Sequence, residues 1–254
     1  MRLFALIGFP LKHSFSKKYF TEKFEKENIE NCTYELLEIP SASGFPKLIT
    51  EHPDLVGVNV TIPHKQAIVP YLTALDPASA GRIGAVNCIK ILPDGQLIGY
   101  NTDYYGFKTS LEDWFTKLSI VPYSIKALVL GNGGAAKAVF AALEDLKVEY
   151  KIVSRTKSSD NLVYEDLNKQ VLNDYKLIIN TSPVGTFPND HECPEIPYQL
   201  LTNNHFLYDL VYNPAETLFL RRGLEQGTNI HNGLEMLYLQ AEKAWEIWNT
   251  KSVS

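Results

Sequence analysis

Residues 126–138 read KALVLGNGGAAKA, and this segment decides the fold. The apolar run 127–130 predicts a strand buried on both faces, and the glycines after it predict a tight turn into a helix. An amphipathic helix pattern follows, and a second strand at 150–154 completes a β-α-β unit of about thirty residues. The segment therefore predicts an α/β protein with a parallel sheet.

The glycine-rich turn of this unit indicates a nucleotide. Glycines between a strand and a helix let backbone N–H groups approach a pyrophosphate at the positive end of the helix dipole. Ala136 takes the last place of the Gly-x-Gly-x-x-Gly fingerprint, which tolerates alanine there. An ordinary strand–helix turn could look the same, but a complete β-α-β unit favours dinucleotide binding. The predicted contacts are Gly131, Asn132, Gly133, Gly134 and Ala135.

The end of the second strand indicates which dinucleotide is bound. Proteins that select NAD usually carry Asp or Glu there, which binds the ribose 2′-hydroxyl. This chain has Ser154, Arg155, Thr156 and Lys157 instead, two cations and two hydroxyl groups. These side chains suit a 2′-phosphate and predict NADP, although a solvated strand end could carry the same charges.

Residues 58–65, which read VNVTIPHK, predict a second group of polar side chains. Alternation places the two valines and Ile62 on one buried face of a short strand, and Asn59 and Thr61 on the other face. Singly, an amide or a hydroxyl of this kind would more often be a structural hydrogen-bonding group.

The proline of this segment ends the strand and opens a helix predicted over 63–71. Lys65 falls in the first turn, where a lone lysine would usually be a solvated surface residue. Together with Asn59 and Thr61 it offers an amide, a hydroxyl and an ammonium to one small volume. Such a group suits a small polyhydroxylated or carboxylated ligand.

The remaining chain alternates strand and helix signals. Further strands are predicted near 2–8, 33–39, 55–61, 176–180, 206–210 and 228–230. Further helices are predicted after Ser14 and over 103–118, 216–226 and 234–249. The Asp-Gly pair at 94–95, between apolar runs at 85–91 and 96–100, predicts an antiparallel hairpin.

Composition narrows the class of protein. The chain is 45% hydrophobic and 21% charged, as ordinary globular proteins are, and its net charge of -5 argues against nucleic-acid or anionic-membrane surfaces. The apolar start at residues 1–8 is too short for a signal peptide, and no run reaches the ~18–20 residues that span a bilayer. Cys32, Cys88 and Cys193 are widely spaced, so neither a disulfide framework nor a metal site is indicated. A cytoplasmic protein is expected.

With the glycine turn and the Asn-x-Thr-x-Pro-x-Lys segment in view, the sequence resembles the shikimate dehydrogenase family. The resemblance extends over nearly the whole chain and in the family's order. The matching segments are 8–16 (GFPLKHSFS), 58–65, 83–87 (IGAVN), 99–103 (GYNTD), 180–185 (NTSPVG), 209–214 (DLVYNP) and 232–240 (NGLEMLYLQ).

The resemblance implies two α/β domains with a cleft between them. Residues 1–102, completed by the C-terminal helix 234–254, would form the substrate domain, and residues 103–233 a Rossmann-like NADP-binding domain. The implied reaction is the reversible NADPH-dependent reduction of 3-dehydroshikimate to shikimate, in the biosynthesis of aromatic amino acids through chorismate. The family includes monomers and homodimers.

The resemblance also implies roles for single residues. Lys65 would transfer the proton, and Asp103 would pair with it. The implied substrate-binding residues are Ser14, Ser16, Asn59, Thr61, Asn87, Tyr212 and Gln240, and Thr181 and Gly233 join the cofactor-binding residues. Structural alternatives stay open: the serines could cap a helix, Asp103 could be an N-cap, and Tyr212 could be a core residue. His13 and His64, beside the implied site, are expected to be packing groups.

Two rival functions remain. A quinate-using relative with relaxed cofactor use often carries threonine where this chain has Ser16, which argues against it. A catalytically silent metabolite-binding regulator is disfavoured by the joint presence of Lys65, Asp103 and Gln240. Relatives that prefer NADP carry a second arginine where this chain has Ser159, so the preference for NADP is expected to be reduced.

Overall fold

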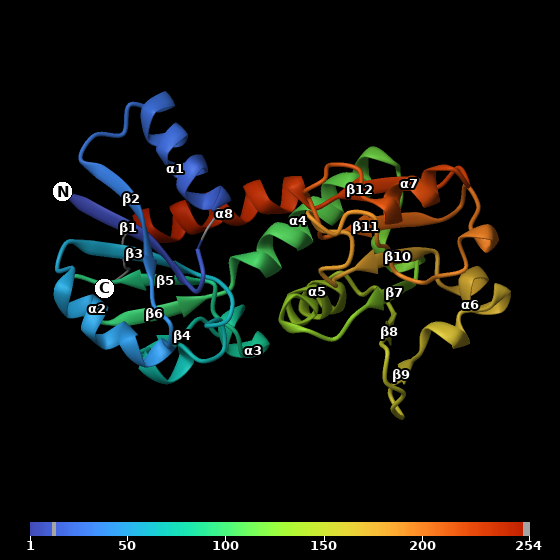
Figure 1. Cartoon of the computed structure of the whole chain (residues 1–254), viewed down its shortest axis with the longest axis horizontal. Helices are drawn as coiled ribbons and strands as arrows, with labels where there is room; N and C mark the ends of the chain where they lie inside the picture. Colours follow the sequence, from blue (N-terminus) through green and yellow to red (C-terminus); the bar gives the residue numbers. More distant parts are fainter. Residues whose placement is uncertain (12–13, 251–254) are drawn as a thin grey trace. The chain divides into compact units, whose positions relative to one another are not determined.

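The computed structural model describes residues 1–11 and 14–250 of the chain. These form two compact units, Met1–Thr102 with the chain from Ala241 onward, and Asp103–Gln240. Each unit is built around a six-stranded sheet (Figure 1). Within the described residues, no helix is both long enough and apolar enough to cross a bilayer.

The first sheet has the strand order β2-β1-β3-β5-β6-β4. Its strands are β1 (Arg2–Gly8), β2 (Cys32–Glu38), β3 (Leu55–Val60), β4 (Ala74–Leu75), β5 (Cys88–Ile91) and β6 (Leu97–Tyr100). β1 runs parallel to β2 and β3, whereas β5 runs antiparallel to β3 and β6. The predicted hairpin around the Asp-Gly pair is therefore confirmed.

Two hydrophobic clusters cover this sheet, one on each face. One contains side chains of η1 (Ala42–Gly44), α2 (Phe45–Glu51) and α3 (Ala80–Ile83). The other is an aromatic layer contributed by α1 (Phe15–Lys26) and the C-terminal half of α8 (Leu234–Asn249). Gly57 permits this layer, because an added Cβ would lie 2.5 Å from the indole nitrogen of Trp248. That indole N–H donates a 3.0 Å hydrogen bond to the carbonyl of Ile89.

The prediction for residues 62–71 is wrong in two respects. β3 ends at Val60, and Ile62 is 76% exposed rather than buried with the valines. The helix predicted over 63–71 is a series of turns that ends in η2 (Val69–Tyr71). Pro70 lies inside the predicted helix and has no N–H to donate, so a regular helix cannot continue through it.

The second sheet is parallel throughout and has the order β12-β11-β10-β7-β8-β9. Its strands are β7 (Ala127–Leu130), β8 (Tyr150–Val153), β9 (Asn161–Leu162), β10 (Leu177–Asn180), β11 (Phe206–Asp209) and β12 (Asn229–Asn232). Every residue of β7 is fully buried, as predicted from its apolar run. The strand order reverses beside β7, where open α/β sheets bind ligands.

Helices cover both faces of the second sheet (Figure 1). Side chains of α4 (Thr102–Lys117) and α5 (Gly134–Asp145) form the hydrophobic cluster on one face. Those of α6 (Lys169–Asp174) and α7 (Leu218–Leu224) join the cluster on the other. The short helices η3 (Pro122–Ser124), η4 (Tyr164–Asp166) and η5 (Tyr198–Leu200) lie in the connections. The β-α-β unit predicted from residues 126–154 is confirmed.

Candidate functional site

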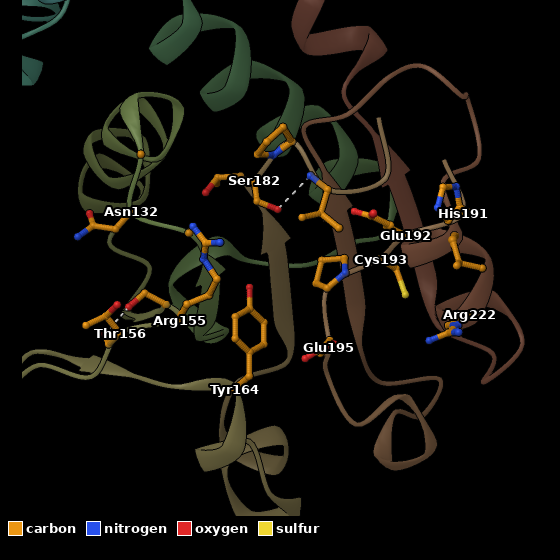
Figure 2. Close-up of a pocket in the computed structure, with 18 residues that line it drawn as sticks. Asn132, Arg155, Thr156, Tyr164, Ser182, His191, Glu192, Cys193, Glu195 and Arg222 are labelled. Carbon is orange, nitrogen blue, oxygen red and sulfur yellow. Dashed lines mark hydrogen bonds between the residues drawn. The ribbon is translucent and has the colours of Figure 1, made fainter. Parts of the chain in front are cut away.

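A cavity of about 940 Å³ lies at the carboxyl ends of β7, β8 and β10 in the second unit (Figure 2). The residues that follow these strands line it, and several of them are the cofactor contacts expected from the sequence. These are Gly131, Asn132, Gly133, Ser154, Arg155, Thr156 and Thr181. The cavity thus brings the glycine turn and the Ser-Arg-Thr segment to one place.

The glycine turn leaves room for a ligand at the start of α5. Gly131 has φ +113, and an added Cβ would lie 2.9 Å from the hydroxyl of Thr181. At Gly133 and Gly134 an added Cβ would meet no heavy atom within 4 Å, so the space beside the turn is open. The first N–H groups of a helix have no partner within it, and here they have the clearance that a pyrophosphate needs. This turn fits a dinucleotide.

The Ser154–Thr156 segment is fixed by its own hydrogen bonds. The hydroxyl of Ser154 donates to the carbonyl of Thr156 at 2.8 Å, and the amide of Asn161 donates to the same carbonyl at 2.8 Å. Arg155 lines the cavity, whereas Lys157 is 70% exposed and pairs with Asp166 at 3.5 Å. Among the described residues that line the cavity, Arg155 is therefore the cation beside the expected 2′-phosphate position.

The cavity also has walls that sequence reasoning did not select. Tyr164 of η4, residues 191–195 of the loop after β10, and Leu218 and Arg222 of α7 line it. Figure 2 shows the guanidinium of Arg155 and the hydroxyl end of Tyr164 directed into the same region. Burial raises the pKa of Tyr164, and the charge of Arg155 opposes part of that rise. No sequence motif marks these residues, because only the folded loops bring them to the glycine turn.

Asp209 holds the two loops that follow β10 and β11. Its carboxylate accepts hydrogen bonds from the amide of Asn180 (2.9 Å), the hydroxyl of Thr217 (2.6 Å) and the backbone N–H of Val211 (3.0 Å). The amide oxygen of Asn180 in turn accepts from the N–H and the hydroxyl of Ser182, beside the cavity. Burial raises the pKa of Asp209 from 3.8 to about 6, against the lowering effect of these bonds. The carboxylate thus fixes the loop that contains Thr181 through hydrogen bonds to uncharged groups.

Five expected residues of the second unit are not in the lining of this cavity. Gly134 and Ala135 lie in the first turn of α5, and an added Cβ at Gly233 would lie 2.1 Å from the carbonyl oxygen of Leu210, which is a packing constraint. The amide of Gln240 is largely buried and donates to the carbonyl of Leu237 at 2.9 Å. Tyr212 is 39% exposed, so it is not a core residue.

The N-cap alternative for Asp103 is wrong. α4 begins at Thr102, so Asp103 lies in its first turn. The backbone N–H of Thr102 donates to the side chain of Asn87 at 2.6 Å, and this amide satisfies the N–H group at the start of the helix.

In the first unit, expected substrate residues gather where β1 and β3 end and α1 begins. Ser14 is the N-cap of α1 and accepts from the N–H of Lys17 at 3.3 Å, so the capping role is confirmed for this serine. Thr61 packs against Gly8, where an added Cβ would lie 2.4 Å from the threonine methyl group. Gly8 therefore lets the first loop approach Thr61 closely.

Buried hydrogen bonds connect two further substrate residues, Asn59 and Asn87. The hydroxyl of Tyr34 donates to the amide oxygen of Asn59 at 2.7 Å. The amide of Asn59 donates to the backbone carbonyl of Asn87 at 3.3 Å, and the amide of Asn87 donates to the hydroxyl of Thr102 at 3.0 Å. Sequence reasoning missed Tyr34 and Thr102 as members of this chain. Amides and hydroxyls gathered near the carboxyl end of β3 can bind a ligand with several hydroxyl groups.

Lys65 lies in the turn after this strand and is partly buried. Its carbonyl accepts from the N–H of Val86 at 2.7 Å, which fixes the turn beside Asn87. His64 is buried, with its Nε2 2.6 Å from the carbonyl of Ile39, and this confirms a packing role. His13 lies outside the described residues. Asp103 belongs to the second unit, and its pairing with Lys65 stays a prediction.

Comparisons with known proteins give one consistent result. Residues 6–89 match the family described as shikimate dehydrogenase substrate binding domain. A shikimate dehydrogenase (NADP(+)) from Clostridium beijerinckii is 39% identical over 98% of this chain and 92% of its own. The crystal structure of shikimate dehydrogenase 1 from Peptoclostridium difficile is 37% identical, with a TM-score of 0.80 over 100% of this chain and 94% of that one. Shikimate 5-dehydrogenase from Thermus thermophilus, solved with NADP(H) and shikimate, is 31% identical, with a TM-score of 0.84 over 98% and 94%.

Proposed function

The chain belongs to the shikimate dehydrogenase family, and on this premise we propose that it catalyses the reversible NADPH-dependent reduction of 3-dehydroshikimate to shikimate. The reaction is a step in the biosynthesis of aromatic amino acids. One observation carries the proposal: the glycine turn, Arg155 and Thr181 line a single cavity in a chain that matches this family over nearly its full length.

We propose that two domains divide the work. A substrate domain of residues 1–102 with the helix 234–254 binds the substrate, and residues 103–233 bind NADP. The buried amides of Asn59 and Asn87 support the first assignment, and the open glycine turn supports the second. The enzyme is further proposed to act as a monomer or homodimer. Its free cysteines support a further proposal, that it acts in the cytoplasm.

In the proposed mechanism, bound NADPH supplies the hydride. Lys65 donates a proton to the carbonyl oxygen of the substrate as negative charge develops there, and it accepts the proton in the reverse direction. Asp103 orients the ammonium. Ser14 and Ser16 bind the substrate carboxylate, which neutral hydroxyls at a helix N-terminus can receive. Asn59, Thr61, Asn87, Tyr212 and Gln240 bind or face the ring and its hydroxyl groups.

Arg155 and Thr156 are proposed to hold the 2′-phosphate of NADP. A guanidinium can form two parallel hydrogen bonds to a phosphate, which favours Arg155 as the main contact. Ser159 supplies no second cation, and Lys157 is paired with Asp166. The enzyme therefore prefers NADP over NAD by less than a relative with two arginines.

The test is the absorbance of NADPH during turnover of the purified protein. Shikimate with NADP+ should give a steady rate, quinate a much lower one, and shikimate with NAD+ a measurable but smaller one. Faster oxidation of quinate would establish the quinate-using alternative. No turnover with either acid, in a protein that still binds them, would establish the silent regulator.

A further inference from the structure

Tyr34 forms a hydrogen bond to Asn59, a side chain that the proposed function assigns to the substrate. It lies on β2, on the sheet face covered by α1 and α8, and its side chain is 3% exposed. Its ring stacks on Phe20 of α1, with centroids 4.7 Å apart and planes at 15°. β1 lies between β2 and β3, so strands about 9.6 Å apart separate Tyr34 from Asn59. A phenol spans that gap where a shorter polar side chain could not.

The hydrogen bonds of Tyr34 have a fixed direction. The backbone carbonyl of Asn87 can only accept, so the amide nitrogen of Asn59 must face it, as it does at 3.3 Å. The amide oxygen of Asn59 therefore faces Tyr34, whose single proton is donated to it at 2.7 Å. One backbone carbonyl thus orients the amide of Asn59 and, through it, the hydroxyl of Tyr34.

We propose that Tyr34 is a positioning residue for the substrate, because it holds the amide of Asn59 in the orientation in which it binds shikimate. This inference rests on the proposed function. One amide hydrogen of Asn59 is left for a ring hydroxyl, since the other is bonded to Asn87.

Burial keeps the phenol in one protonation state. It raises the pKa of Tyr34 well above its usual value, so the hydroxyl remains a donor to Asn59 throughout the range in which an enzyme is assayed. The orientation of Asn59 is therefore independent of pH.

Tyr34→Phe tests the inference because it keeps the ring and its stacking and removes only the hydroxyl. The Kd and KM for shikimate should rise roughly five- to tenfold, the effect of one lost hydrogen bond, while kcat stays within about twofold. The Kd for NADP+ should not change. A matched control is Tyr208→Phe in the second unit, which removes another fully buried hydroxyl, bonded to Ser110 at 2.9 Å. It should lower the unfolding temperature without changing the KM for shikimate.

A double-mutant cycle with Asn59→Ala separates positioning from general destabilisation. If Tyr34 acts through Asn59, the double variant should bind shikimate at least about threefold better than the product of the single effects predicts. Multiplicative effects, or an unchanged or lower KM in Tyr34→Phe, would overturn the inference while leaving the proposed function intact. A parent protein that neither oxidises nor binds shikimate would overturn the proposed function, and this inference with it.

Discussion

Single residues of the two candidate sites have separable roles. The carboxylate of Asp209 accepts hydrogen bonds from neutral partners, and Arg155 is the cation placed at the end of β8. In the first unit, the buried amide of Asn59 connects the end of β3 to Asn87, near the turn that carries Lys65. Substitutions at these positions therefore distinguish cofactor binding from proton transfer.

Arg155→Ala should reduce kcat/KM chiefly with NADP+, because NAD+ has no 2′-phosphate for the guanidinium to bind. A lost charge-assisted bond changes affinity by roughly ten- to a hundredfold. Lys157→Ala is the matched control, since Lys157 is exposed and paired with Asp166, and it should change either value by less than about threefold. Steady-state kinetics with both cofactors provide the measurement. Equal losses with NAD+ and NADP+ would contradict the role given to Arg155.

Lys65→Ala should lower kcat by about 10²–10⁴-fold, the usual effect of removing a positioned proton-transfer group. The Kd for NADPH, measured by its fluorescence, should stay within about twofold, because the proposed NADP site lies in the other unit. Near-normal turnover would exclude Lys65 as the proton donor.

Sequence patterns identified the residues whose chemistry is local. The glycine turn, Arg155 and Ser14 were predicted because each depends on neighbours a few residues away. Tyr34 was missed because its partner is two strands away, and alternation along a strand cannot reveal that distance. The role of Lys157 as a phosphate cation stays a prediction, and its ion pair with Asp166 could not be read from the sequence because the fold brings the two together.

At the scale of elements, glycines set how closely strands and helices pack. Gly57 of β3 lies directly under Trp248 of α8. At Gly106 of α4, an added Cβ would lie 2.6 Å from the carbonyl oxygen of Met236 in α8. The apolar pattern predicted most of these helices and strands within a few residues. The prediction of a helix over 63–71 was wrong because the apolar pattern does not take into account that a second proline, Pro70, interrupts the backbone hydrogen bonds.

Gly57→Ala should lower the free energy of unfolding by about 1–3 kcal/mol, because the new methyl group would overlap the buried indole of Trp248. Gly44→Ala serves as control, since an added Cβ there has its nearest neighbour at 3.7 Å. Urea unfolding of both variants and the parent gives the comparison. Equal stabilities for the two variants would mean that Trp248 moves aside without cost.

At the scale of the whole molecule, buried titratable groups link stability to pH. The pKa of Asp209 is raised to about 6, so the folded chain binds a proton there more tightly than the unfolded chain does. Burial lowers the pKa of His205 and His231, so those groups stabilise the folded state less as the pH falls through 6.5. Between about pH 4 and 6.5, a fall in pH therefore makes the contribution of Asp209 to stability more favourable and those of the two histidines less favourable.

Comparison with Asp209→Asn isolates the carboxylate. Because the folded pKa exceeds the unfolded one, the contribution of Asp209 should be most favourable below about pH 4 and should fall by about 3 kcal/mol as the pH rises through 6. The unfolding temperature of the parent minus that of the variant should decrease over this range in scanning calorimetry. A difference that stays constant with pH would show that the carboxylate titrates alike in both states.

The position of the unit boundary inside α8 also sets the order in which the protein is completed during translation. The first unit includes the chain from Ala241 onward, so the ribosome makes the whole of Asp103–Gln240 before it makes Trp248. Until then, the aromatic side chains of Phe4 and Phe20 lack one of their covering rings. The nascent chain therefore carries an uncovered apolar face through most of its synthesis, a state that invites aggregation and chaperone binding. The unit that begins to be translated first is the one that finishes folding last.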